Sequence, residues 1–324
     1  MKKFVSIDIS SKTLDIYFKE NGNSTFKKIK NDVKSISSFL KPINSPDTIV
    51  SMENTGRYNW NLYEVLAQLQ CTVYVIPPIQ IKKSLGLVRG KNDKIDAKRI
   101  GEYVEEKISK LTPWKPCPKN IQKIKILLTE RTARMKTLKQ YTCLKNDYKL
   151  MKNIGLSEDL STLNENLANA IKDQIKEIEI KIKKIINEDQ GLLTQSEFAK
   201  SVPVVGTVVS WMFIAKTEGF TTITNPRKMS CYSGVAPFDH QSGTSIKGRP
   251  RVSHYADKSM KSVLHLAAMA AIQGNNDLAT YYKRKVSEGK NKMSVLNSVR
   301  NKIIPRVFAT IRNQRKYSFC LETS

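Results

Sequence analysis

Cysteine is scarce in this chain, and its spacing excludes two kinds of site. The five cysteines (Cys71, Cys117, Cys143, Cys231 and Cys320) are odd in number, lie far apart and never form a C-x-x-C pair. Such spacing is typical neither of a disulfide framework nor of a zinc site. We therefore expect buried thiols.

Long hydrophobic runs are also missing. The longest uncharged apolar window, 201–215, is interrupted by Pro203 and Gly206, and it falls short of the roughly 18 to 20 residues that a membrane span needs. At the N-terminus, Asp8 interrupts the apolar run that a signal peptide would need. We therefore expect a cytoplasmic protein with no membrane partner. The 12 prolines and 14 glycines are scattered, which excludes collagen-like and low-complexity chains.

Acidic residues are in the minority. The chain of 324 residues has 29 Asp and Glu against 55 Lys and Arg, a formal net charge of +26. A polyanion is the expected partner of such a charge. The alternative is a uniformly lysine-rich composition, but residues 225–324 alone hold 18 basic and 5 acidic residues, which is 13 of the 26 excess charges. This concentration favours nucleic acid.

Residues 1–118 are expected to form an α/β domain. Three β-type runs, FVSIDIS, TLDIYFKE and STFKKIK, come first, and an Asn-Gly turn signal joins the second to the third. Helical and β-type runs then alternate: NDVKSISSFL, DTIVSMEN, WNLYEVLAQLQ and CTVYVIPP. The order β-β-β-α-β-α-β, followed by a helix, predicts a ribonuclease H-like fold.

The rest of the chain is expected to be helical, which makes the fold class α/β plus α. Residues 119–190 contain no proline between 120 and 188, and their apolar residues recur at helical spacing on both sides of Gly155. They predict an antiparallel coiled coil with a seam at Ile175, Ile178, Ile182 and Ile185. Residues 191–324 are expected to form a mainly helical C-terminal domain.

Four carboxylates stand where the predicted sheet would gather them. Asp8 lies inside the first strand, Glu53 ends the fourth strand, and Asp93 and Asp96 share one face of the following helix. Hard oxygen ligands suit Mg²⁺ or Mn²⁺. Singly, each has an ordinary alternative as a strand-edge acid, a helix N-terminal carboxylate or a solvated helix face. Their joint placement favours a metal site.

A second candidate site lies at Ser242. This serine precedes Gly243 in a turn-prone stretch, and three basic residues follow that could clamp a phosphate: Lys247, Arg249 and Arg251. A hydroxyl in such a field could act as a nucleophile, although serine before glycine is also ordinary turn chemistry. The competing nucleophiles are Tyr232, Ser233, Ser245 and Tyr255, and the nearby possible bases are His240 and His254.

A phosphate-loop reading of the segment 86–92 fails. Only three residues separate Gly86 from Gly90, and Asn92 stands where the motif has Ser or Thr. We therefore do not expect a nucleoside triphosphatase. An enzyme that rearranges DNA without ATP would have to keep the energy of the phosphodiester bond by transesterification.

Several motifs resemble those of one family from about Val5 to Ala271. They are IDISSKTLDI, MENTGRYNW, the K-N-D-x-x-D-A run at 91–97, SVPVVGTVVS and YSGVAPFDHQSG. In this order they resemble the IS110 insertion-sequence transposases, DEDD recombinases related to Piv-type DNA invertases. The resemblance implies that Asp8, Glu53, Asp93 and Asp96 form the metal-binding tetrad of a RuvC-like domain and that Ser242 is the nucleophilic serine.

The resemblance also implies the partners. These are donor and target DNA, a noncoding bridge RNA and further copies of the chain, in a dimer or tetramer with a composite active site. The family's P-G-I-G motif appears here as 203–206 with Val204 in place of the first glycine, so we expect packing there rather than DNA contact. Two alternatives stay open: a metal-dependent RuvC-like nuclease or junction resolvase without serine chemistry, and a noncatalytic RNA- or DNA-binding protein.

Overall fold

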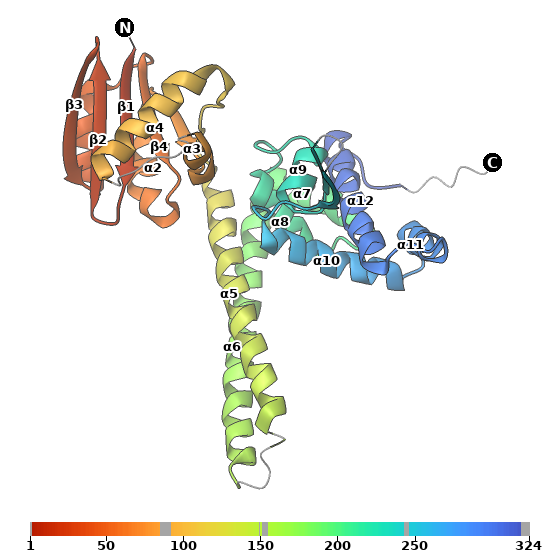
Figure 1. Ribbon diagram of the computed structural model, residues 1–324. Helices are drawn as coiled ribbons and strands as arrows, with labels where there is room; N and C mark the ends of the chain where they lie inside the picture. Colours follow the sequence, from red (N-terminus) through yellow and green to blue (C-terminus); the bar gives the residue numbers. More distant parts are fainter. Residues whose placement is uncertain (1, 85–91, 149, 151–154, 243–245, 319–324) are drawn as a thin grey trace. The chain divides into compact units, whose positions relative to one another are not determined.

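The computed structural model describes residues 2–84, 92–148, 150, 155–242 and 246–318. These form two compact units, Met1–Pro116 and Cys117–Ser324 (Figure 1). The further division of the second unit near residue 190 stays a prediction.

The first unit is built on a five-stranded sheet with the order β3-β2-β1-β4-β5. The strands β1 (Lys3–Ile9), β2 (Thr13–Glu20) and β3 (Asn23–Lys30) are antiparallel. The strands β4 (Thr48–Glu53) and β5 (Thr72–Ile76) continue the sheet in parallel with β1. The predicted ribonuclease H-like strand order is therefore confirmed. The β2–β3 turn has positive φ at both Asn21 (52°) and Gly22 (83°), as a tight two-residue hairpin turn requires.

Alternation along the strands gives the sheet two different faces. The side chains of Val5, Ile7 and Ile9 pack into one core together with Leu40 and Leu62, which lie on α1 (Val33–Leu40) and α2 (Trp60–Leu66). The helices α3 (Pro78–Ser84) and α4 (Asp93–Lys107) contribute to a separate cluster. The side chains of Ser6 and Asp8 face away from the first core, toward α4.

The second unit is almost entirely helical. Two long helices, α5 (Lys119–Tyr148) and α6 (Ser157–Asn187), pack side by side (Figure 1). Ile175, Ile178 and Ile182 of the predicted seam are buried, and coiled-coil geometry stays a prediction. The remaining helices are α7 (Gln190–Ser201), α8 (Thr207–Thr217), α9 (Pro226–Tyr232), α10 (Lys258–Gln273), α11 (Asp277–Ser287) and α12 (Lys292–Arg312).

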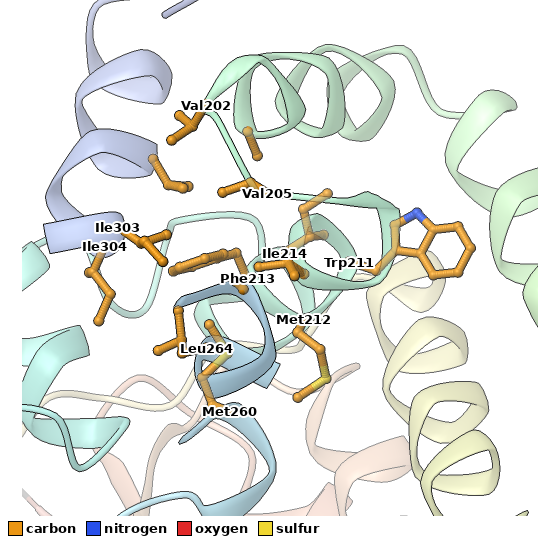
Figure 2. Packing of buried hydrophobic residues seen from close by; sticks show 14 of the residues in the cluster. Val202, Val205, Trp211, Met212, Phe213, Ile214, Met260, Leu264, Ile303 and Ile304 are labelled. Atoms are coloured by element: carbon orange, nitrogen blue, oxygen red, sulfur yellow. The ribbon is translucent and has the colours of Figure 1, made fainter. Parts of the chain in front are cut away.

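The core of this unit surrounds α8, as Figure 2 shows. Trp211, Phe213 and Ile214 of this helix are buried, together with Leu264 of α10 and Ile303 of α12. Within the uncharged apolar window seen in the sequence, every residue from Val209 to Ala215 is buried, whereas Gly206 and Thr207 are exposed. No helix among the described residues is long and apolar enough to cross a membrane.

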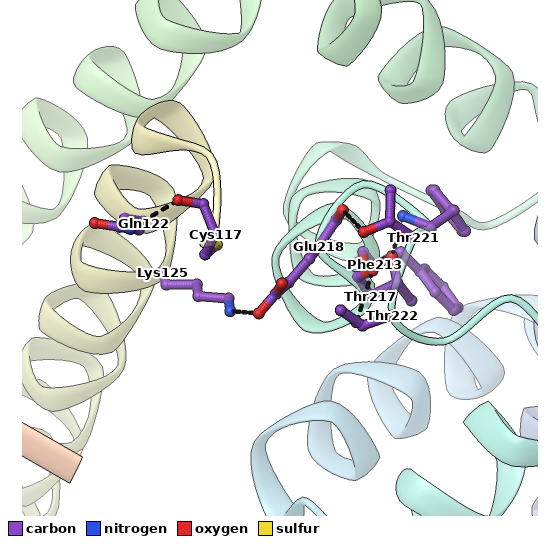
Figure 3. A network of polar contacts seen from close by, with 9 residues as sticks. Cys117, Gln122, Lys125, Phe213, Thr217, Glu218, Thr221 and Thr222 are labelled. Carbon is purple, nitrogen blue, oxygen red and sulfur yellow. Dashed lines mark hydrogen bonds and ion pairs between the residues drawn. The ribbon is translucent and has the colours of Figure 1, made fainter. Parts of the chain in front are cut away.

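A polar network joins the start of α5 to the end of α8 (Figure 3). The ammonium of Lys125 lies 2.6 Å from a carboxylate oxygen of Glu218, and Gln122 donates a hydrogen bond to the carbonyl of Cys117 (2.7 Å). The helical hairpin is thus anchored to the bundle at its base.

Burial raises the pKa of the Cys117 thiol, although this cysteine is only half-buried. The expectation of buried thiols is wrong for Cys143, which is exposed, and Cys71 and Cys231 are half-buried.

One element of the second unit was not expected. The strands β6 (Phe238–Ser242) and β7 (Ile246–Arg251) form a two-stranded antiparallel sheet, whereas the sequence predicted a turn-prone loop around Ser242. Pro250 lies within β7, which is tolerated because both strands of a two-stranded sheet are edges.

Candidate active site

A row of charged residues crosses four neighbouring strands of the first unit. Asp8 lies opposite Asp15 on β2, and Asp15 lies opposite Lys28 on β3. On the other side of β1, Met52 of β4 pairs with Ile7. Glu53 is the next residue of β4, as Asp8 is the next residue of β1, so these two carboxylates are neighbours in the parallel strands. Since residues paired across strands point to the same face, this face carries three carboxylates and one ammonium. The Lys28 nitrogen lies 3.1 Å from an oxygen of Asp15, which is 6% exposed.

The helix α4 lies against this face because it carries a glycine at the contact. A β-carbon on Gly101 would come within 2.5 Å of the Ser6 hydroxyl oxygen, and that oxygen accepts a hydrogen bond from the Ser51 hydroxyl (2.8 Å). The side chain of Asn92 caps the helix by accepting from the backbone N–H of Lys94 (3.1 Å). This placement puts the first turn of α4 beside the charged row.

The four predicted carboxylates influence one another electrostatically. The pKa of Asp8 is raised from 3.8 to about 6, first by burial and then by the negative charges of Asp93, Asp96 and Glu53. The backbone N–H of Ile9 opposes this rise. The fold therefore brings carboxylates from β1, β4 and α4 near enough for their charges to act on Asp8.

The side chains do not converge on a single point. The guanidinium of Arg99 binds Asp96 at 2.9 Å, and Asp93 is exposed at the start of α4. Among the described residues, no group of three or more His, Cys, Asp or Glu side chains is arranged to hold a metal ion. The fit to Mg²⁺ or Mn²⁺ rests on the hard oxygen donors and on the raised pKa of Asp8.

The second predicted site belongs to the second unit. Ser242 is the last residue of β6 and pairs with Ile246. Arg251, at the end of β7, is exposed. The side chains of Ser242, Lys247, Arg249 and His240 lie outside the described residues, as do Ser245 and most of the segment 86–92.

Two of the competing nucleophiles are engaged elsewhere. The buried hydroxyl of Ser233 donates to the carbonyl of Met229 (2.7 Å). The phenol of Tyr232 donates to Asp257 (3.1 Å), and burial raises its pKa further above the ordinary value. Both side chains therefore have structural partners, while Tyr255 and His254 are exposed.

Asp257 is a residue that the sequence did not single out. Its carboxylate accepts hydrogen bonds from Lys216 (2.8 Å), from Tyr232 and from the backbone N–H of Met260 (2.7 Å). Burial raises the pKa of Asp257, but the hydrogen bonds from Lys216, Ser259 and Met260 outweigh it, and the pKa falls to about 2. One carboxylate thus joins α8, α9 and α10 where the chain leaves β7.

Comparison with known families decides the identity. Residues 5–150 match the DEDD transposase model of IS110, described as "Transposase", and residues 196–283 match "Transposase IS116/IS110/IS902 family". The chain belongs to this transposase family. The first match contains all four carboxylates, and the second contains Ser242 and Asp257.

Relatives of this family member include DNA-inverting proteins. The chain is 24% identical to the pilin gene-inverting protein of Moraxella bovis over 327 residues, covering 98% of both chains. It is 26% identical over 117 residues to the uncharacterized 43.6 kDa protein of insertion element IS110 from Streptomyces coelicolor, covering 36% of this chain and 29% of that protein. Among solved structures, RuvC of T. thermophilus in complex with Holliday junction substrate is 14% identical, with a TM-score of 0.28, and covers 35% of this chain and 100% of that chain.

Proposed function

We propose that this transposase cuts and rejoins DNA through a covalent phosphoserine link at Ser242, with a divalent metal held by Asp8, Glu53, Asp93 and Asp96. The observation that carries the proposal is geometric: Asp8 and Glu53 lie on one face of the sheet, and α4, which carries Asp93 and Asp96, packs against β1 and β4. The raised pKa of Asp8 is consistent with this placement. A full-length relative named for inverting a pilin gene supports strand exchange as the reaction.

The reaction balances without ATP. The Ser242 oxygen attacks the scissile phosphorus, the bond from phosphorus to the leaving sugar oxygen breaks, and the serine proton ends on that oxygen. Reversal by a sugar hydroxyl of the exchanged strand restores the phosphodiester and frees the serine. A divalent metal at the carboxylates would supply charge neutralisation for the phosphate. Lys247, Arg249 and Arg251 would bind the DNA backbone near the serine.

Recognition of donor and target DNA is proposed to depend on a bridge RNA, and the active complex is proposed to be a homodimer or homotetramer. The net charge of +26 supports the binding of both DNA and RNA, because each has a negatively charged backbone. Sequencing of RNA that co-purifies with the protein from cells carrying the whole element tests the guide, since a guided enzyme retains one discrete RNA species.

The chemistry is tested by sequencing recombination junctions in cells that carry the complete element. We expect junctions with the wild type and with Ser287→Ala, an exposed serine of the same unit, but none with Ser242→Ala or Asp8→Asn. A nicked DNA substrate should also trap a covalent adduct on Ser242. Junctions made by Ser242→Ala would instead establish a metal-dependent nuclease without serine chemistry.

Metal binding has a readout that does not depend on activity. Mg²⁺ or Mn²⁺ should raise the melting temperature of the wild-type protein through mass action and leave that of Asp8→Asn unchanged. Equal shifts in both proteins would contradict the assignment of Asp8, and unchanged nucleic-acid binding without any metal effect would favour a noncatalytic binding protein.

A further inference from the structure

A groove of about 790 Å³ lies in the second unit between α12 and the base of the β6–β7 hairpin. This volume lies within the range of roughly 300 to 1,000 Å³ typical of ligand-binding pockets. It can take a nucleotide or two, but not a base-paired duplex. None of the five residues assigned to catalysis, Asp8, Glu53, Asp93, Asp96 and Ser242, lines it, although Val235 and Pro237 of the lining belong to the motif that carries Ser242.

One wall of the groove is a neutral hydrogen-bonding surface on α12. Ser294, Ser298 and Asn301 follow one another at helical spacing along this wall, with Asn291 and Asn297 beside them. Lys302 adds a positive charge, and the described lining residues include no carboxylate. Amides and hydroxyls of this kind both donate and accept hydrogen bonds, as the edges of nucleic-acid bases require.

The rest of the lining is largely apolar. Pro237, Pro250 and Val252 come from the two ends of the hairpin, and Tyr281 of α11 completes the lining. The Lys302 nitrogen lies 4.6 Å from the centre of the Tyr281 ring. An aromatic ring and apolar side chains beside a cation provide stacking for a base and a charge for its phosphate.

A buried cation stands behind the amide wall. Arg300 is 7% exposed, and it donates to His265 (2.7 Å) and to the amide oxygen of Asn297 (3.4 Å). Its Nε finds no hydrogen-bond partner among the described residues. Asn297 in turn donates to the carbonyl of Val235 (2.8 Å). Asn297, which accepts from this guanidinium, also lines the groove, so an anionic strand held there would lie near a buried positive charge.

We propose that this groove binds unpaired nucleotides of a single nucleic-acid strand, with bases against Tyr281, Pro237 and Pro250 and phosphate at Lys302. The proposal rests on the proposed function, because it places the groove next to the reacting serine. Ser242 is five residues from Pro237 along the chain, a separation of at most about 16 Å in extended backbone.

Binding by the full-length protein tests the proposal. Fluorescence anisotropy at one salt concentration would compare unpaired DNA, unpaired RNA and duplex DNA, each about ten nucleotides long. All proteins carry Ser242→Ala, so that failure of the serine chemistry does not affect the result. Ser294→Trp fills the groove, and Lys302→Ala removes its charge. The matched controls on the same helix are Met293→Trp and Lys292→Ala, both exposed and outside the groove.

We expect Ser294→Trp and Lys302→Ala to weaken binding of unpaired strands by at least about five-fold, the loss of one stacked base or phosphate contact. The controls and duplex binding should change by less than about two-fold. A larger loss for DNA than for RNA identifies a separated DNA strand as the occupant, and the reverse identifies the guide RNA. Equal losses for duplex and unpaired strands, or losses no larger than those of the controls, would overturn the proposal.

Discussion

Gly101 of α4 lies so close to Ser6 of β1 that a β-carbon would meet the serine hydroxyl at 2.5 Å. Ser6 is fully buried and bonded to Ser51, so its hydroxyl cannot move away freely. This contact sets the distance between the helix that carries Asp93 and Asp96 and the strand that carries Asp8.

Gly101→Ala should therefore destabilise the protein by about 1 to 2 kcal/mol, because overpacking outweighs the better helix propensity of alanine. Ser6→Ala removes the hydroxyl oxygen that the new β-carbon would meet. The double variant should therefore lose at least about 1 kcal/mol less stability than the sum of the two single losses. Urea denaturation of the four proteins measures this coupling. Strict additivity would show that the two residues do not limit the approach of α4.

The raised pKa of Asp8 predicts a pH dependence for the metal-free protein. Because the folded state holds this proton more tightly than the unfolded state, stability contributed by the group is present at low pH and falls as pH rises from about 4 to about 6. Asp8→Asn should lack this decrease and be more stable than wild type above pH 6. Thermal unfolding in EDTA across this range tests it, with the exposed Asp173→Asn as control. Parallel curves for wild type and Asp8→Asn would be the contrary result.

Asp257 predicts the opposite dependence. Its folded pKa lies near 2, below the ordinary 3.8, so its contribution is present above about pH 4 and is lost as pH falls toward 2. Asp257→Ala should cost about 2 kcal/mol at neutral pH, through the lost helix cap and charged hydrogen bonds. This cost should shrink in acid. Tyr232→Phe keeps the Asp257 carboxylate, so this variant should still lose stability in acid. A Tyr232→Phe protein whose stability no longer depends on acid pH would contradict this account.

Val204 has a φ of +67°, a conformation that costs an L-residue about 1 to 2 kcal/mol. Glycine adopts it freely, so Val204→Gly should be about 1 kcal/mol more stable than Val204→Ala. At buried Val205, which is not in this conformation, alanine should be better than glycine by about 0.5 to 1 kcal/mol. Thermal unfolding of the four variants tests this reversal. The same order at both positions would show that Val204 is not strained.

The sequence predicted the parts of the fold that local patterns control. The Asn21–Gly22 turn, the β-type run that forms β1 and the spacing of Asp93 and Asp96 on one helix each depend on a few adjacent residues, and the structure contains all three. The order of strands then implied which carboxylates would meet. The assignment of Ser242 as the nucleophile stays a prediction.

Other features depend on contacts between distant segments, and the sequence did not show them. The sequence did not single out Asp257, because its role depends on Lys216 and Tyr232, which come from other helices. The strand β7 carries Lys247, Arg249 and Pro250, so it lacks the apolar alternation that would indicate a strand. The only sign of the strained φ of Val204 in the sequence was that the family's P-G-I-G motif has a glycine at that position.

The edge strand β3 has a consequence for solubility. It is the outermost strand of the sheet, and Lys27, Lys28 and Lys30 on it are all exposed. An open edge can recruit strands from other chains, and lysines oppose such pairing by mutual repulsion. At high protein concentration, these lysines would keep the sheets of neighbouring molecules from joining edge to edge into aggregates.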